Sequence, residues 1–148
     1  MKTFVDASGK TWNVALNLES AMRVKDLAEV DLLQPEAGEP PLITRIGTDE
    51  YLLAKVLLAL LSDQFEQNGV TEAEVKRAFD GRTFADAQRA FYAELSDFFQ
   101  SRGRGDRAKA VLKQAEILGL AVAAAERRVE QIDAAAKVDG AMSGLSPE

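Results

Sequence analysis

One stretch of this 148-residue chain gathers carboxylates that could bind a divalent cation or a basic partner. Between Asp26 and Glu50 seven acids accompany a single base, Arg45. Their spacing matches no calcium-binding loop, and the prolines among them oppose a compact cage of ligands. We therefore expect a solvated acidic segment, with recognition of a basic partner as the alternative. The acids are Asp26, Glu29, Asp31, Glu36, Glu39, Asp49 and Glu50.

A second stretch, from Arg102 to Lys113, is basic. Its first residues, RGRGDR, place arginines and glycines at a predicted helix start, where free backbone N–H groups can hold a phosphate. The complete phosphate-binding loop also needs Gly-Lys-Ser or Gly-Lys-Thr, and neither follows. We expect a connection between two helices that carries solubilising arginines.

The chain contains no cysteine and no histidine. It therefore lacks disulfides, thiol nucleophiles, imidazole acid–base catalysts and the usual zinc ligand sets. No other residue set indicates an active site, so the sequence predicts a protein that is not an enzyme and that needs no cofactor or metal. The net charge of −6 argues against nucleic acid as the main ligand.

The longest apolar run, from Tyr51 to Leu61, is eleven residues long and contains Lys55. A membrane-spanning helix needs about 20 apolar residues, so this run predicts a buried helix and no membrane partner. The N-terminus, MKTFVD, has an acid at position 6 and no apolar stretch typical of a signal peptide. We expect a cytoplasmic protein.

The predicted elements begin with a β-hairpin formed by residues 3–5 and 12–16, because residues 6–10 contain the Asp and Gly of a turn. Trp12, Val14 and Leu16 alternate, so one face of the second strand is apolar and must pack on helices.

Asn17 is a favourable N-cap for a helix that continues to about Val30. We expect Leu18, Met22 and Leu27 on the inner side of this helix.

Prolines and a glycine make residues 33–47 irregular, apart from a short turn from Pro41 to Ile46. Thr48 is then predicted to cap a central helix that continues to about Gln67. Apolar residues surround nearly all of that helix, so it should be the most buried element. They are Leu52, Leu53, Val56, Leu57, Leu58, Leu60 and Leu61.

Thr71 and Glu74 form a capping box for a short helix that should end at Gly81, and Thr83 is predicted to cap the next helix. That helix carries an apolar stripe at helical spacing. Such a stripe indicates core packing, because platforms that stack on bases usually lie beside a basic groove. The stripe consists of Phe84, Ala87, Phe91, Leu95 and Phe98.

From Asp106 to Val138 there is no proline, and apolar residues recur at alternating steps of three and four. This heptad repeat predicts one helix about 50 Å long at ~1.5 Å per residue, longer than a small domain can cover. The stripe then binds another copy or another protein, or it folds back on its own domain as core. Its members are Ala108, Val111, Ala115, Leu118, Val122, Ala125, Val129, Ile132 and Ala136. The candidate partner-binding residues are Val111, Leu118, Val122, Val129 and Ile132.

Together these elements predict a mainly α fold, with an N-terminal β-hairpin packed on a small helical domain and a long C-terminal helix. The expected division is a hairpin and helical core at residues 1–103, the heptad-patterned helix at 104–139 and a flexible tail at 140–148.

Several segments resemble tail assembly chaperones of long-tailed bacteriophages and prophages. They are residues 2–12 (KTFVDASGKTW), 23–27 (RVKDL), 30–33 (VDLL), the leucine-rich helix from Tyr51, and 91–99 (FYAELSDFF). The resemblance covers roughly residues 1–100 and does not include the alanine-rich C-terminus.

The resemblance implies a non-enzymatic protein of the host cell cytoplasm that binds the helical tape measure protein, or other tail proteins, during tail morphogenesis. Two alternatives stay open. The chain is a structural tail or head-to-tail connector component of the virion, or it is an acidic phage regulator that binds a host protein. Self-association through the heptad stripe, giving a homo-oligomer, is compatible with each of them.

Overall fold

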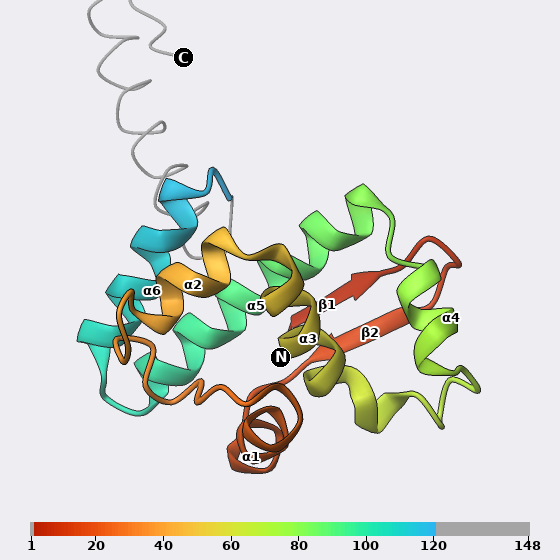
Figure 1. The fold of residues 1–148 in the computed structure, drawn as a ribbon, viewed down its shortest axis with the longest axis horizontal. Helices are drawn as coiled ribbons and strands as arrows, with labels where there is room; N and C mark the ends of the chain where they lie inside the picture. Colours follow the sequence, from red (N-terminus) through yellow and green to blue (C-terminus); the bar gives the residue numbers. More distant parts are fainter. Residues whose placement is uncertain (1, 121–148) are drawn as a thin grey trace, which may run out of the picture.

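A computed structural model describes residues 2–120 of the chain (Figure 1). The described part is mainly helical and begins with a two-stranded antiparallel hairpin, which confirms the predicted fold class. The elements are β1 (Lys2–Val5), β2 (Thr11–Val14), α1 (Leu18–Ala28), α2 (Leu42–Thr48), α3 (Glu50–Leu61), the 3-10 turn η1 (Ser62–Gln64), α4 (Glu72–Arg77), α5 (Gly81–Ser101) and α6 (Gly105–Ile117).

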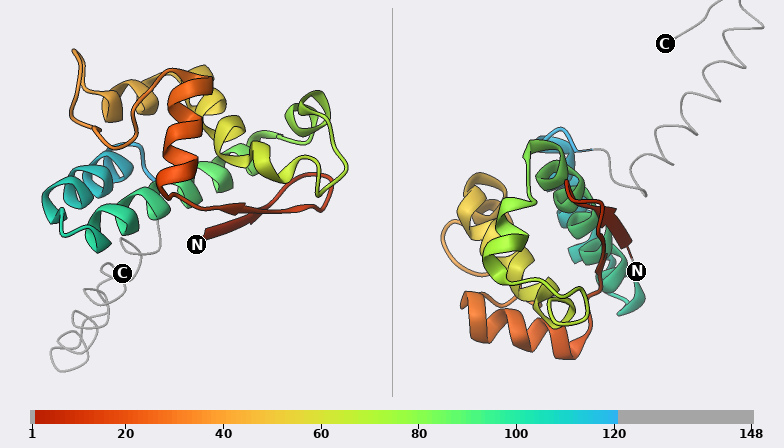
Figure 2. Two further views of the ribbon diagram at one scale, coloured as in Figure 1. Left: turned by 90° about the horizontal axis from the view of Figure 1, so that it is seen from below. Right: turned by 90° about the vertical axis from the view of Figure 1, so that its right-hand side faces the viewer.

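The hairpin pairs Phe4 with Trp12, and both side chains are buried. β1 and β2 lie beside α5, the longest described helix, while β2 also contacts α3 (Figure 2). At the tip of the hairpin, the Ala7 N–H donates to the carbonyl of Ala78, at the end of α4. The apolar face of the hairpin is therefore covered by helices, as the alternation in the second strand predicts.

α3 is the central helix. Leu53, Val56, Leu57 and Leu61 are each at most 1% exposed, so the helix is largely buried as predicted, although Leu52 and Leu58 are only half-buried. The Asp49 side chain accepts hydrogen bonds from the N–H groups of the first turn, which makes Asp49 the N-cap rather than Thr48. Thr48 instead ends α2.

α1 packs on α3, but with a different face from the predicted one. Leu18, Met22 and Leu27 are 66%, 59% and 63% exposed, so their predicted inward orientation is wrong. The buried face is made of smaller side chains, which let the two helices approach closely. They are Ser20, Ala21, Val24 and Ala28.

The caps of α4 and α5 differ from the predictions at one point. Thr71 and Glu74 form the expected capping box of α4. Asp80 caps α5, and Gly81 is its first residue rather than a helix stop. The predicted cap, Thr83, is buried inside the first turn.

α6 ends at Ile117, which corrects the prediction of an uninterrupted helix from Asp106 to Val138. Gly119 has φ +74°, and the Leu120 N–H donates to the Ala115 carbonyl at 2.8 Å. This is a Schellman motif, in which a glycine in the left-handed conformation closes the helix. The heptad repeat passes through this stop signal without a gap, so its period alone did not reveal the end.

α6 packs on α5 and α2, and its buried residues Ala108, Val111 and Ala115 join the same core as the other helices. Figure 1 shows α6 beside α2, on the side of the molecule away from α4. The predicted boundary near residue 103 falls in the turn between α5 and α6. The rest of the heptad segment and the tail at 140–148 lie outside the described residues.

Candidate interaction surfaces

The candidate partner-binding residues differ in their burial and in whether the structure describes them. Val111 is completely buried in the core, so it is not available to a partner. Leu118 is half-buried and packs against the core beside Gly47, where an added methyl group would lie 3.2 Å from Leu118 Cδ1. Val122, Val129 and Ile132 lie outside the described residues. For the described part of the stripe, folding back on the domain is therefore the correct alternative.

Three residues of the acidic segment make structural contacts within the fold. Asp31 accepts a hydrogen bond from the Leu33 N–H, Glu36 pairs with Arg107, and Asp49 caps α3. Within residues 2–120, no group of three or more acidic side chains is placed to hold a metal ion.

The basic segment is also engaged in internal contacts. The Arg104 guanidinium donates two hydrogen bonds to Asp106, and this contact lowers the pKa of the Asp106 carboxyl to about 2. Arg107 donates to the Leu33 carbonyl and lies over the ring of Phe99, 5.7 Å from its centre. Residues 102–104 connect α5 with α6, as expected, but Arg104 and Arg107 make contacts within the fold rather than only solubilising it.

The aromatic stripe of α5 divides between core and surface. Ala87, Phe91 and Leu95 are buried, as the assignment to the core predicts. Phe98 and Phe84 are half-buried and pack against the core, and Phe84 also lines a surface groove.

That groove is an open concave surface with a volume of about 750 Å³. It lies between the end of α1, the outer side of α3, α4 and the start of α5, and we call it the α1–α3–α4 groove. Its apolar lining includes Leu27, Leu58, Phe79 and Phe84, with Tyr51 at one end. The other lining residues are Ala28, Glu29, Ala54, Lys55, Leu57, Ala59, Ser62, Glu72 and Lys76.

Two large apolar side chains of the groove are strongly exposed: Leu27 at 63% and Tyr51 at 84%. The charged lining residues are two acids and two bases, and Glu72 and Lys76 form an ion pair at 3.0 Å. Exposed apolar side chains that line a groove with a polar rim are typical of a binding site for an apolar segment.

The sequence predictions missed this groove, although a signal was present. Leu18 and Met22 are about 40° apart around a helix, whereas Leu18 and Leu27 are about 180° apart at ~100° per residue. These three residues cannot share one inner face, so at least one of them had to be exposed. The groove itself depends on how α4 and the start of α5 lie beside α3, which no local pattern encodes.

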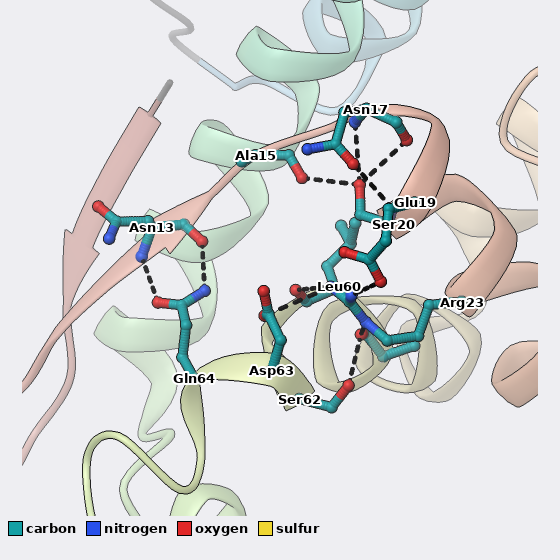
Figure 3. Close-up of polar contacts among 11 residues, drawn as sticks. Asn13, Ala15, Asn17, Glu19, Ser20, Arg23, Leu60, Ser62, Asp63 and Gln64 are labelled. Atoms are coloured by element: carbon teal, nitrogen blue, oxygen red, sulfur yellow. Dashed lines mark hydrogen bonds and ion pairs between the residues drawn. The ribbon is translucent and has the colours of Figure 1, made fainter.

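A smaller polar cluster lies between α1, the end of α3 and β2 (Figure 3). Arg23 donates hydrogen bonds to the carbonyls of Ala59 and Leu60, and also pairs with Glu19 and Asp63. Its guanidinium satisfies carbonyls that the end of a helix leaves without partners.

In the same cluster the Gln64 side chain pairs with both backbone groups of Asn13. Its Oε1 accepts from the Asn13 N–H at 2.9 Å, and its Nε2 donates to the Asn13 carbonyl at 2.8 Å. Gln64 thereby occupies the hydrogen-bonding edge of β2, and the cluster has a structural role.

No helix within the described range is long and apolar enough to cross a bilayer. Comparison with known protein families, curated proteins and solved structures found no match to this chain.

Proposed function

We propose that this chain is a non-enzymatic tail assembly chaperone of a long-tailed bacteriophage or prophage. In this role it binds the tape measure protein in the host cytoplasm while the tail assembles. The resemblance of residues 1–100 to such chaperones suggests the role. The observation that carries it is the open apolar groove with Leu27 and Tyr51 exposed.

The groove has the chemistry that a helical client requires. An amphipathic helix binds in this way by placing its apolar side chains into a groove lined with aliphatic and aromatic residues. Burying one Leu-sized side chain contributes about 1.5–3 kcal/mol, so a few contacts of this kind hold a client while leaving the complex reversible. Reversibility matters because a chaperone has to leave its client.

The acidic regulator is less well supported. Asp31, Glu36 and Asp49 already serve a turn, an ion pair and a helix cap, which leaves fewer acids for a basic partner. The alternative that the chain is a structural component of the virion is distinguished from the chaperone role by the experiment below.

The test is co-expression with the tape measure protein encoded in the same genome, followed by pull-down. The variant Leu27→Ser/Tyr51→Ser removes two exposed apolar contacts of the groove. Since ~1.4 kcal/mol corresponds to a tenfold change in affinity, its recovery of the tape measure protein should fall at least about tenfold. The matched control is Leu18→Ser/Met22→Ser, which alters similarly exposed residues of α1 away from the groove and should bind normally.

Circular dichroism should show that both variants are folded, because the altered side chains are exposed. A wild-type chain that does not bind the tape measure protein would contradict the proposal. Stoichiometric amounts of the chain in purified virions, detected by mass spectrometry, would instead identify a structural component.

A further inference from the structure

We infer that the α1–α3–α4 groove is a docking site for the C-terminal segment of the same chain, residues 121–138. In this arrangement the segment covers Leu27 and Tyr51 when no other partner is bound. The inference goes beyond the proposed function and does not depend on it.

The first observation is the place where the described chain ends. Leu118, at the end of α6, lies against Gly47, near the end of α2. Gly47 precedes Tyr51 by four residues, so their Cα atoms are at most about 15 Å apart. The chain therefore leaves the described part close to the end of the groove where Tyr51 lies.

The second observation is the reach of the segment. Its 18 residues, 121–138, span about 27 Å as a helix at ~1.5 Å per residue, and about 60 Å when extended. The extended length is sufficient to run from Leu120 past Gly47 to Tyr51 and on into the groove. Gly119, in the left-handed conformation, changes the direction of the chain just before it.

The third observation is chemical complementarity. The segment carries Val122, Val129 and Ile132 at heptad spacing, with alanines between them that permit close approach. Its charged residues are three acids and three bases, namely Glu126, Glu130, Asp133, Arg127, Arg128 and Lys137. The charges that line the groove also balance, so no net repulsion opposes docking.

The tether favours this occupant over a second copy. Because the segment belongs to the same chain, its effective concentration at the groove is of the order of millimolar, far above the concentration of free chains in a dilute sample. Docking within one chain is then expected even where the contacts are too weak to hold two chains together.

Disulfide trapping in the full chain tests the inference, because the natural sequence contains no cysteine. Leu27→Cys is combined, in three separate variants, with Val122→Cys, Val129→Cys or Ile132→Cys. Each has a counterpart with Leu18→Cys in place of Leu27→Cys. Leu18 and Leu27 are 66% and 63% exposed on the same helix but about 180° apart around it, so only Leu27 lies in the groove.

Under mild oxidation at low protein concentration, at least one Leu27→Cys pair should form an intramolecular disulfide ten times faster than its Leu18→Cys counterpart. Adding Ser at the two other stripe positions should slow that trapping, whereas Ala123→Ser/Ala134→Ser should not. Equal rates for the two cysteine positions on α1 would overturn the inference. Cross-linking only between chains would overturn it too, in favour of a second copy. The two proposals can fail separately, because disulfide trapping measures contact within one chain and the pull-down measures binding of the tape measure protein.

Discussion

Asp6 accepts four hydrogen bonds at the tip of the hairpin, although it is only 6% exposed. The donors are the Ser8 N–H and hydroxyl, the Lys10 N–H and the Trp12 indole N–H. Burial alone would raise the pKa of the Asp6 carboxyl. The hydrogen bonds outweigh it, so the pKa lies below its usual value of 3.8.

Asp6→Ala should lower the free energy of unfolding by about 2–3 kcal/mol, because it leaves the buried indole N–H of Trp12 without its acceptor. Urea denaturation followed by Trp12 fluorescence measures the change. Ser8→Ala, which removes one exposed donor, is the control and should cost less.

The same carboxyl gives a pH dependence. A group whose pKa is lower in the folded state stabilises the protein above its unfolded pKa, and this contribution is lost as the pH falls through the folded value. The stability difference between wild type and Asp6→Ala should therefore shrink as the pH is lowered below about 4. A difference that stays constant would show that the pKa of Asp6 is the same in the folded and unfolded protein.

At the scale of elements, α1 shows how a helix can be predicted correctly while its orientation is not. Asn17 caps it as expected, and its side chain and that of Ser20 form a reciprocal capping box. Its larger apolar residues nevertheless face outward, and Val24 is the largest apolar side chain on the buried face.

Val24→Ser should lower the free energy of unfolding by about 2–4 kcal/mol, since it removes buried apolar contacts and introduces a hydroxyl at a fully buried position. Met22→Ser, two residues away and 59% exposed, should change it by less than about 0.5 kcal/mol. Thermal or urea unfolding of the pair measures both. A larger cost for Met22→Ser would restore the inward face predicted from the sequence.

At the scale of the whole molecule, Arg107 joins α6 to a part of the chain more than seventy residues earlier. Its side chain is 21% exposed, donates to the Leu33 carbonyl, pairs with Glu36 and lies over Phe99. These contacts connect the irregular segment after α1 with α5 and α6.

Arg107→Ala should lower the free energy of unfolding by about 1–3 kcal/mol, because a half-buried, charge-assisted contact with several partners is lost. Arg107→Lys should recover only part of it, since an ammonium cannot reproduce the guanidinium fork. Hydrogen exchange should show faster opening of residues 33–36 in both variants. Unchanged exchange there would mean that this segment is held by its apolar contacts alone.

Features that depend on neighbouring residues can be predicted from the amino-acid sequence. The hairpin, the capping residues Asn17 and Thr71, and the enclosure of α3 follow from turn chemistry, capping and apolar content within a few residues. Gly119 is also a local helix-stop signal, but the heptad period continues through it and predicts a longer helix.

Which helix faces are buried and which side chains stay exposed depends on how the helices pack together. Val111 could have served a partner or the core, and packing against α5 and α2 assigns it to the core. Leu27 and Tyr51 line a groove because α1, α3 and α4 converge around it, and that arrangement results from contacts between residues far apart in the chain. Local propensity carries no information about such contacts, because many arrangements of the same helices share the same local pattern.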